Sequence, residues 1–580
     1  MPSSVRKNRV LSGVVLAVIL VCGFVVRARG LTNLLPLVMN RDGLVHLRQT
    51  EYFQGYRGDP EGERMLTVNP QLFSRLAALW PTPPLPPPSR SIRLDQALEL
   101  SRWTWVHLRT ISLILSPFTI WLSYLLARRF LDRPSSLFAA GLVATCFLQI
   151  LPSAQEKAHS AVTTFLLLSL LAAMRLRRKP DAGSYLLFGV GAALTMGTLH
   201  HGLMCIPVFA VAWLLREKRP ARASSAWILA PVGMFLASLW LWCPFVFEPG
   251  FGQEHSTEGR PSPTQMFLRI LRPDEYQLDR PVFLLREVWK HDPVLVSISA
   301  LGAVLLAAWA LRDRERLRGA FRGDTAILLA YTLPYSLAFF FIKSTNARYT
   351  AELVPVLAIL GGYAFSRGPV RWLSRASVPA LRGVGMMAIG GAVLALPYAP
   401  AWRLSEIRSR TDTLEECAHW IEGNLEPGCR IVTIPVLDLP LLPTDEALAE
   451  NTSVLWKSAW AEFLSRGYLA SVAAPRYGVL VCPGDRAEAR GALLEDPQAY
   501  LRKWRAEYVV LMTPADPLYD SVRRWLQENA EVLARFSPLR KEVDFRNEHV
   551  VFQNDPGDAD VCTLLECRAL GPTVEIYRLR

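Results

Sequence analysis

The stretch "LRTISLILSPFTIWLSYLLARRFLDRPSSLFAAGLVATCFLQI", residues 108–150, decides the fold class. It contains most of two apolar runs, near 106–127 and 136–151, which are separated by the basic turn "ARRFLDR". About 20 apolar residues in a helix are enough to cross the roughly 30 Å hydrocarbon layer of a bilayer. Two such runs joined by an arginine-rich turn predict a pair of antiparallel membrane-spanning helices.

Nine further apolar runs bring the predicted number of spans to eleven. They lie near 10–26, 160–174, 184–199, 202–215, 225–246, 293–311, 325–342, 351–366 and 383–400. Five arginine-rich loops fall on one side in this arrangement, and the positive-inside rule assigns that side to the cytoplasm. We therefore predict a polytopic α-helical membrane protein. Because no small-residue cleavage site follows the first run, we interpret that run as an uncleaved span with a cytoplasmic N-terminus.

The composition changes after residue 400. Stretches such as "RTDTLEECAHWIEGNLEPGCRIVTIP" (410–435) alternate helix and strand patterns, which predicts a soluble α/β domain. The predicted organisation is a transmembrane domain at 1–400 and an α/β domain at 401–580. An odd number of spans makes this domain extracytoplasmic, on the same face as two long outer loops, 27–105 and 247–292.

The net charge of +13 is clustered in the loops of a chain that is 51% hydrophobic. Basic clusters beside apolar spans are typical of membrane topology and of contact with lipid headgroups. The chain has no recognisable nucleic-acid-binding motif, so we expect membrane lipids and not nucleic acid as partners.

A charged stretch, "MNRDGLVHLRQTEYFQGYRGDP" (39–60), follows soon after the first span. Its carboxylate at Asp42 lies at the predicted membrane surface, where a lipid-borne substrate meets an aqueous one. Partial desolvation raises the pKa of a carboxyl group and makes it a better base, provided that cations keep it ionised. The simpler interpretation of Asp42 is a helix cap or a salt bridge with Arg41.

Four cations on the predicted outer face are candidates for binding a phosphate. Arginine holds phosphate in bidentate geometry, and lysine does so as a point charge. The alternative is ordinary snorkelling of basic side chains at helix ends. The four candidates are Lys343, Arg348, Arg109 and Lys157, and Tyr349 follows directly after one of them.

Two pairs of residues have the spacing of metal ligands on one helix face. Glu156 and His159 are three residues apart, and Asp42 and His46 are four apart. Carboxylates and imidazoles at such spacing suit a divalent ion. Each of these residues is also explained as a hydrogen-bonded polar group, so a divalent metal ion is left open as a cofactor and none is required.

The chain resembles the GT-C membrane glycosyltransferases, and within them the branch of the bacterial protein O-mannosyltransferases and the lipid A aminoarabinose transferase (glycosyltransferase family 39-like). The resemblance rests on "RDGLVHLRQ" (41–49) after the first span, on the stretch quoted above, on "HSAVTTFLLLSLLAAMRLRR" (159–178) and on "IKSTNARYTAELVPVLAILGGYAF" (342–365). Two departures stand out. His159 occupies a position where many relatives carry aspartate, and Gly43 follows Asp42 where relatives often have a second acidic residue.

The resemblance implies an inverting transfer of a monosaccharide from a polyprenyl-phosphate donor to an acceptor hydroxyl, on the outer face of the bacterial inner membrane. It gives Asp42 the role of general base, and it makes Lys343 and Arg348, then Arg109 and Lys157, the groups that hold the leaving phosphate. The remaining candidates for the substrate site are Arg41, His46, Glu156, His159 and Tyr349.

Two other functions are alternatives. An oligosaccharyltransferase-like enzyme would carry a Trp-Trp-Asp-Tyr-Gly block, and the sequence has none. A flippase or transporter for lipid-linked sugars would need charged residues in the middle of its spans, and the predicted charges gather at span ends. The acceptor stays open between protein, lipid and polysaccharide.

Overall fold

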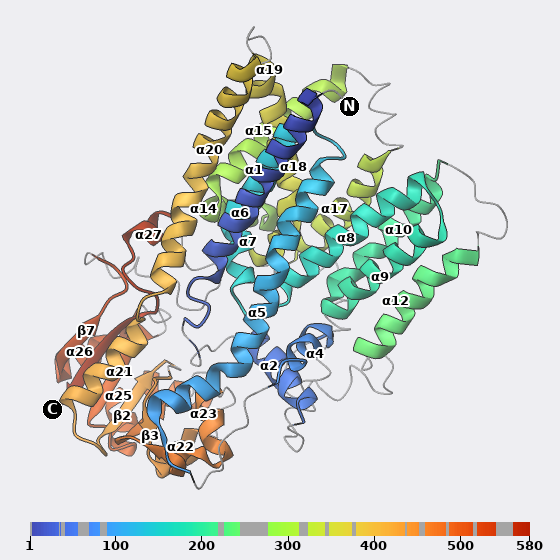
Figure 1. Ribbon diagram of the computed structural model, residues 1–580. Helices are drawn as coiled ribbons and strands as arrows, with labels where there is room; N and C mark the ends of the chain where they lie inside the picture. The colour runs from blue at the N-terminus through green and yellow to red at the C-terminus, as the bar shows by residue number, and fades with distance from the viewer. Residues whose placement is uncertain are drawn as a thin grey trace. The chain divides into compact units, whose positions relative to one another are not determined.

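The computed structural model describes most of the chain (Figure 1). It covers residues 3–33, 35, 41–55, 69–81, 90–217, 226–243, 276–312, 323–342, 347–373, 379–435, 438–451, 459–482, 487–513, 519–540 and 561–580. The chain divides into two compact units. Unit 1 comprises Met1–Ala28, Val45–Trp80 and Leu108–Trp402, and unit 2 comprises Arg29–Leu44, Pro81–His107 and Arg403–Arg580.

Unit 1 is built from apolar helices. In chain order the principal helices are α1 (Ser3–Ala28), α4 (Leu72–Ala78), α5 (Leu94–Ala127), α6 (Arg133–Thr145), α7 (Phe147–Ser153), α8 (His159–Arg178), α9 (Ala182–Thr198), η1 (His200–Met204), α10 (Cys205–Leu214), η2 (Ala226–Ile228), α12 (Leu229–Trp242), α14 (Arg280–His291), α15 (Pro293–Arg312), α17 (Asp324–Phe340), η6 (Ala347–Leu353), α18 (Val354–Phe365), η7 (Ser366–Val370), α19 (Arg371–Leu373) and α20 (Pro379–Arg408). Helix α2 (Arg41–Phe53) begins in unit 2 and continues into unit 1.

Every predicted span coincides with an apolar helix. Among the described residues, six helical segments are long and apolar enough to cross a membrane, and the bent pair α6–α7 adds a seventh if it counts as one span. The four remaining predicted spans correspond to the shorter apolar helices Ala182–Thr198, His200–Leu214, Leu229–Trp242 and Asp324–Phe340. The chain is thus a polytopic helical membrane protein, and eleven crossings stay a prediction.

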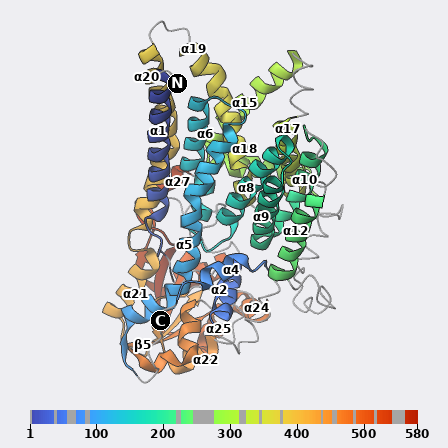
Figure 2. The same ribbon diagram turned by 45° about the vertical axis from the view of Figure 1, so that its right-hand side comes forward.

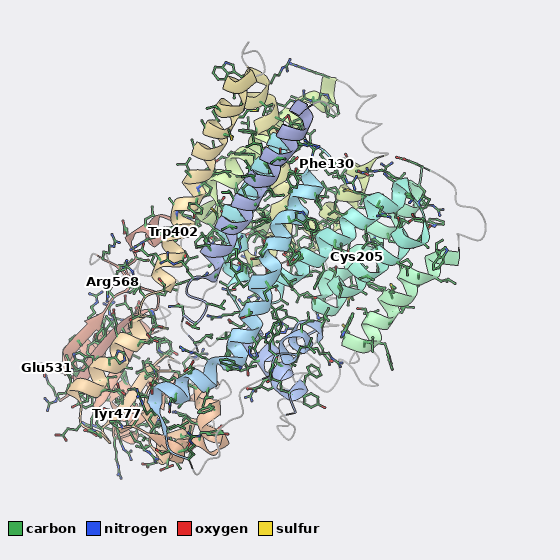
Figure 3. All side chains as sticks on the ribbon, in the orientation of Figure 1. Phe130, Cys205, Trp402, Tyr477, Glu531 and Arg568 are labelled. Atoms are coloured by element: carbon green, nitrogen blue, oxygen red, sulfur yellow. The ribbon has the colours of Figure 1, made fainter. Side chains whose placement is uncertain are left out.

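The outer surfaces of these helices carry large apolar side chains. Val14, Leu236, Val304 and Leu337 are all more than half exposed. In water such a surface would aggregate, whereas in a bilayer it faces hydrocarbon. Helices α8, α9, α10 and α12 lie side by side in both ribbon views (Figures 1 and 2), and side chains fill the space between them (Figure 3).

A sharp break separates α6 from α7, whose axes differ by 54°. A helix break leaves backbone carbonyls on one side and amides on the other without partners. Arg27 serves the carbonyl side, because its guanidinium donates to the oxygens of Ala144 at 2.8 Å and Val143 at 3.2 Å. Asp292 serves the amide side and accepts from the backbone nitrogens of Phe147 at 2.8 Å and Leu148 at 3.0 Å.

The Asp292 carboxylate also accepts from the Cys146 thiol at 3.3 Å and is 3% exposed. Burial raises the pKa of the Asp292 carboxyl to about 6, and the backbone hydrogen bonds act against that shift. A charge of suitable sign therefore stands at each side of the break, as the helix dipole favours. The two charges fix where α7 starts and hence where the turn after it lies.

Replacing Asp292 by alanine is expected to lower the free energy of unfolding by about 1–3 kcal/mol, since two buried amides lose their acceptor. A thermal melt of the purified protein in detergent measures the loss. Asp279 is the matched control, because it stands at the start of α14 but makes no capping hydrogen bond through its side chain. Equal melting temperatures for Asp292→Ala and Asp279→Ala would contradict the capping role.

Unit 2 contains a six-stranded sheet in the order β3-β5-β2-β6-β8-β7. The strands are β2 (Arg430–Ile434), β3 (Leu442–Pro443), β5 (Arg476–Val481), β6 (Tyr508–Thr513), β7 (Ala530–Phe536) and β8 (Thr573–Leu579). Strand β2 runs parallel to β5 and β6, while β8 runs antiparallel to β6 and β7. Its helices are α21 (Thr413–Asn424), α22 (Asp445–Asn451), α23 (Ala459–Phe463), η8 (Leu464–Tyr468), η9 (Leu469–Ser471), α24 (Ala487–Glu495), α25 (Pro497–Lys503), α26 (Asp520–Asn529) and α27 (Val561–Glu566).

The sheet has the helix–strand alternation expected after residue 400. Val432, Val509, Leu526 and Tyr577 form part of its buried core. Helix α21 begins at a true cap, because the Asp412 side chain accepts from the backbone nitrogens of Leu414 and Glu415. The domain boundary at 400/401 and the extracytoplasmic location stay predictions.

Unit 2 also takes in a part of the long predicted outer loop. The short strand β1 (Ile92–Arg93) pairs in parallel with β4 (Val472–Ala473). Helix α5 begins directly after β1 and is 34 residues long. It therefore starts twelve residues before the predicted span at 106–127, since its polar first turns continue the same helix.

Candidate functional site

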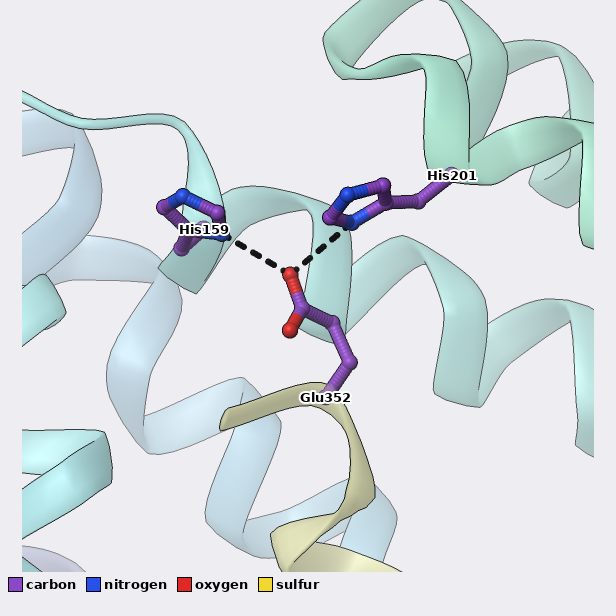
Figure 4. A group of neighbouring side chains, drawn as sticks. All are labelled: His159, His201 and Glu352. Carbon is purple, nitrogen blue, oxygen red and sulfur yellow. Dashed lines mark hydrogen bonds and ion pairs between the residues drawn. The ribbon is translucent and has the colours of Figure 1, made fainter. Parts of the chain in front are cut away.

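Three buried polar side chains meet inside unit 1 (Figure 4). The Nδ1 atoms of His159 and His201 lie 2.9 Å and 3.1 Å from the same oxygen of Glu352, Oε1. His159 opens α8, His201 lies in η1 and Glu352 lies in η6. All three are at most 6% exposed, so their charges are shielded from water.

Aromatic rings surround this cluster. The Tyr335 hydroxyl lies 3.0 Å from Glu352 Oε2 and 2.7 Å from the carbonyl oxygen of Tyr349. The His201 ring packs edge-on against Tyr335, Phe339 and Tyr349, with centroid distances from 4.6 to 5.8 Å. These contacts fix the orientation of the polar side chains within largely apolar surroundings.

A buried ion pair lies in the turn that leads into α8. The Arg109 guanidinium donates to Glu156 Oε2 at 3.0 Å, and both side chains are 1% exposed. Lys157 is buried beside them at 2% exposure, and its backbone carbonyl accepts from the Ser112 hydroxyl at 3.1 Å. Helix α5 thus anchors this turn through both a charge pair and a hydrogen bond.

Chain direction puts these groups at one end of the helices of unit 1. Helix α8 runs from His159 to an arginine-rich last turn at 175–178. There, Arg177 pairs with Asp324 at 3.1 Å, and Asp324 opens α17. Helices α10 and α18 likewise start close after His201 and Glu352. The His–Glu cluster and the arginine-rich end are therefore opposite ends of the same helices.

The candidate phosphate-binding residues fall into different surroundings. Arg348 is half-buried in η6, and its guanidinium lies 5.4 Å from the centre of the Tyr349 ring. The Tyr349 ring in turn lies 5.6 Å from the His159 ring, so these three predicted residues are neighbours. Arg109 and Lys157 are both buried in the turn region, where Arg109 is engaged with Glu156. Lys343 lies outside the described residues.

The candidates in the first outer segment lie in α2. Arg41 and Asp42 are its first two residues, and their side chains lie outside the described part of the chain. His46 is buried: its Nδ1 lies 3.1 Å from the Ser74 hydroxyl and its ring packs edge-on against Phe73. These contacts give His46 a packing role within unit 1.

The predicted pairing of Glu156 with His159 is wrong, whereas the pairing of Asp42 with His46 stays a prediction, because the Asp42 side chain lies outside the described residues. Glu156 lies in the turn before α8, so the three-residue spacing to His159 does not place both on one helix face. Its carboxylate faces Arg109 instead. Of the predicted ligands whose side chains the structure describes, His46, Glu156 and His159, only His159 belongs to the group of potential ligands, and its companions are His201 and Glu352.

Glu352 and Asp292 are absent from the residues singled out by sequence. Each is an acid at the start of a predicted span, near 351–366 and 293–311, and an acid so close to the hydrocarbon is costly unless it has a partner. Their position at the start of a span was therefore the feature of the sequence that could have identified these two acids. His201 follows the predicted span at 184–199 at its outer end, as His159 precedes the predicted span at 160–174, and this shared location indicates that the two histidines could meet in one site.

Comparison with protein families gives one match to this region. Residues 94–242 match the family described as dolichyl-phosphate-mannose-protein mannosyltransferase. The matched segment runs from α5 to α12 and includes Arg109, Glu156, His159 and His201. The predicted resemblance to GT-C membrane glycosyltransferases is thereby confirmed over this segment, and the match supports a membrane glycosyltransferase. A comparison with curated protein sequences gives no match.

Several solved structures match the chain over most of its length. The archaeal oligosaccharyltransferase AglB from Archaeoglobus fulgidus, in complex with an inhibitory peptide and a dolichol-phosphate, is 13% identical, with a TM-score of 0.49 over 87% of this chain and 70% of that one. ArnT from Cupriavidus metallidurans bound to undecaprenyl phosphate is 12% identical, with a TM-score of 0.46 over 91% and 96%. The arabinofuranosyltransferase AftD from Mycobacteria is 18% identical, with a TM-score of 0.41 over 98% and 40%.

Proposed function

We propose that the protein transfers a monosaccharide from a polyprenyl-phosphate donor to an acceptor hydroxyl, with inversion, on the outer face of the bacterial inner membrane. The family match over residues 94–242 supports a donor of this chemical type, because that family is described by a lipid-phosphate-linked sugar. The hydrophobic tail would anchor such a donor in the bilayer, with its phosphate at the membrane surface.

The observation that carries this proposal is the gathering of buried and half-buried polar groups at one end of the unit 1 helices. Arg348, the Arg109–Glu156 pair, Lys157 and the cluster around Glu352 all lie at the end opposite the arginine-rich turns. The positive-inside rule assigns arginine-rich turns to the cytoplasm, which leaves the polar end to the outer leaflet. Sugar chemistry at the outer surface needs polar groups in that place.

The chemistry assigns a separate role to each kind of residue. Asp42 takes the proton of the acceptor hydroxyl as its oxygen attacks the anomeric carbon, and the bond from that carbon to the phosphate oxygen breaks. The polyprenyl phosphate leaves with a negative charge, which cations must stabilise where it develops. Arg348 and Lys343 are our first choices for this task. Arg109, whose guanidinium donates to Glu156, and Lys157 are our second choices.

Substituting Arg348 or Lys343 by alanine is expected to raise the apparent KM for the donor about 10- to 100-fold, since a hydrogen bond to a charged group contributes about 1.5–3 kcal/mol. The acceptor KM should change little. The assay uses purified protein, a polyprenyl-phosphate donor with a radiolabelled sugar, and a panel of hydroxyl acceptors. Reconstituting the protein in lipid vesicles with the same donor also measures translocation of the donor across the bilayer, which is the activity of a flippase.

Arg216 provides the matched control for Arg348. Its guanidinium lies 4.4 Å from the Trp213 ring, so it makes the same kind of stacking contact after α10, at the arginine-rich end. Arg216→Ala should leave the donor KM unchanged. Donor translocation without sugar transfer by the wild type would overturn the proposed function, and an unchanged donor KM in both Arg348→Ala and Lys343→Ala would remove these residues from the donor site.

A further inference from the structure

The cluster of His159, His201 and Glu352 contains a buried carboxylate, whose negative charge needs a compensating positive charge. The Glu352 side chain is fully buried, with 0% exposure. Within the described residues, its only ion-pair partners are the two histidines, and both approach the same oxygen. A buried carboxylate is very costly without a compensating cation. One protonated imidazole would balance the carboxylate, whereas protonating both would put two like charges close together, since their ring centres are 5.9 Å apart; a bound cation balances the carboxylate with both imidazoles neutral.

The positions of the donor atoms suit a metal ion. Zinc binds histidine nitrogen and carboxylate oxygen at about 2.0–2.2 Å, so neighbouring ligand atoms in a tetrahedral shell are about 3.3 Å apart. The two nitrogen–oxygen separations here are 2.9 Å and 3.1 Å, and one ligand atom from each of the three residues lies within 4.8 Å of the others. An ion would therefore need only small movements of the two imidazoles.

The surroundings also resemble the support that metal ligands receive in proteins. The second carboxylate oxygen of Glu352 contacts the Tyr335 hydroxyl, which fixes the orientation of the carboxylate. The three ligands come from α8, η1 and η6, and each element is held by packing within unit 1. Two imidazoles and one carboxylate form a ligand set that leaves a fourth zinc position open for water or another oxygen.

We propose that His159, His201 and Glu352 bind one divalent transition-metal ion of the zinc type, with a coordination position left open. The ion replaces the two hydrogen bonds to Glu352 Oε1 and supplies the positive charge that the buried carboxylate needs. Imidazole ligands favour zinc, cobalt and nickel over magnesium and calcium, which prefer oxygen. The proposal goes beyond sugar transfer and requires none of its steps.

Metal content of the full-length protein tests the site without any sugar donor. The purified protein is stripped with a chelator in detergent, incubated with Zn²⁺ or Co²⁺, desalted and analysed by elemental analysis. We expect about one ion per chain, and for cobalt the intense visible absorption of a tetrahedral site. A wild-type chain that retains neither ion, or that shows only the weak bands of octahedral cobalt, would overturn the proposal.

Variants then locate the ion. His159→Asn, His201→Asn and Glu352→Gln should each lose most of the bound metal, while Tyr335→Phe keeps the ring and should weaken affinity about 10- to 100-fold. His419→Asn is the control, because His419 is exposed on α21 in unit 2 and should not affect binding. Equal metal retention by the wild type and a folded Glu352→Gln variant would also overturn the proposal. If a ligand variant fails to fold, the metal affinity of Tyr335→Phe and the cobalt spectrum of the wild type still test the proposed site.

Discussion

Asp42→Asn is expected to abolish sugar transfer while the protein still folds and inserts. A positioned general base contributes about 10²–10⁴-fold to the rate, so kcat should fall by about that factor. Asparagine has nearly the same shape as aspartate but cannot accept the acceptor proton. Because the substitution is at the second residue of α2 and leaves its apolar residues unchanged, the fold should persist. The measurement is steady-state transfer from a labelled donor, with the donor KM determined alongside.

A role in proton transfer differs from a role in donor binding. Loss of kcat with an unchanged donor KM in both Asp42→Asn and Asp42→Ala indicates the chemical step. Glu51→Gln is the matched control, since Glu51 is an acid in the same helix and has no assigned role in the chemistry. Full activity in both Asp42 variants would exclude the residue from the mechanism, and a raised donor KM with normal kcat would make it a binding residue.

Arg109→Met is expected to lower the free energy of unfolding by about 3–5 kcal/mol, because it leaves the Glu156 carboxylate buried without its ion-pair partner. The Arg109–Glu156 pair is 3.0 Å long, and each side chain is 1% exposed. Replacing both residues with apolar ones of similar volume, as in Arg109→Met with Glu156→Leu, should recover most of the loss. Denaturant or thermal unfolding of the two single variants and the double variant gives this coupling energy.

The double variant also separates structure from donor binding. If Arg109 only balances Glu156, a stable double variant should retain the wild-type donor KM. The exposed pair Arg93–Asp95 is the control: it is 2.7 Å long with side chains 76% and 63% exposed, so breaking it should cost less than about 1 kcal/mol. Full additivity of the Arg109 and Glu156 substitutions would contradict the charge pair, and a raised donor KM in a stable double variant would return Arg109 to the donor site.

Local sequence patterns were enough to predict the helical part of the fold. Apolar run length predicted where apolar helices lie in the described part of the chain, since it depends only on neighbouring residues and the thickness of a bilayer, whereas the number of membrane crossings stays a prediction. The extent of α5 was not predictable in this way. Its first turns are polar and continue the helix after β1, and β1 pairs with residues near 472, almost 400 positions along the chain.

The candidate site was predicted only in part, because its contacts are between distant residues. His159 and Glu352 are 193 residues apart, and no periodicity connects them. Spacing linked His159 with Glu156 instead, and that link fails because α8 begins at His159 itself. The grouping of Arg348, Tyr349 and His159 likewise depends on how η6 packs against α8.

The discontinuous course of unit 2 limits how this protein can be dissected or recombined. Its three segments, Arg29–Leu44, Pro81–His107 and Arg403–Arg580, belong to one compact unit, in which β1 pairs with β4. A fragment that ends at residue 400 would contain β1 without its partner strand β4. A fragment that begins after residue 400 would contain β4 without β1. Chimaeras between relatives should therefore exchange the early segments together with the C-terminal one.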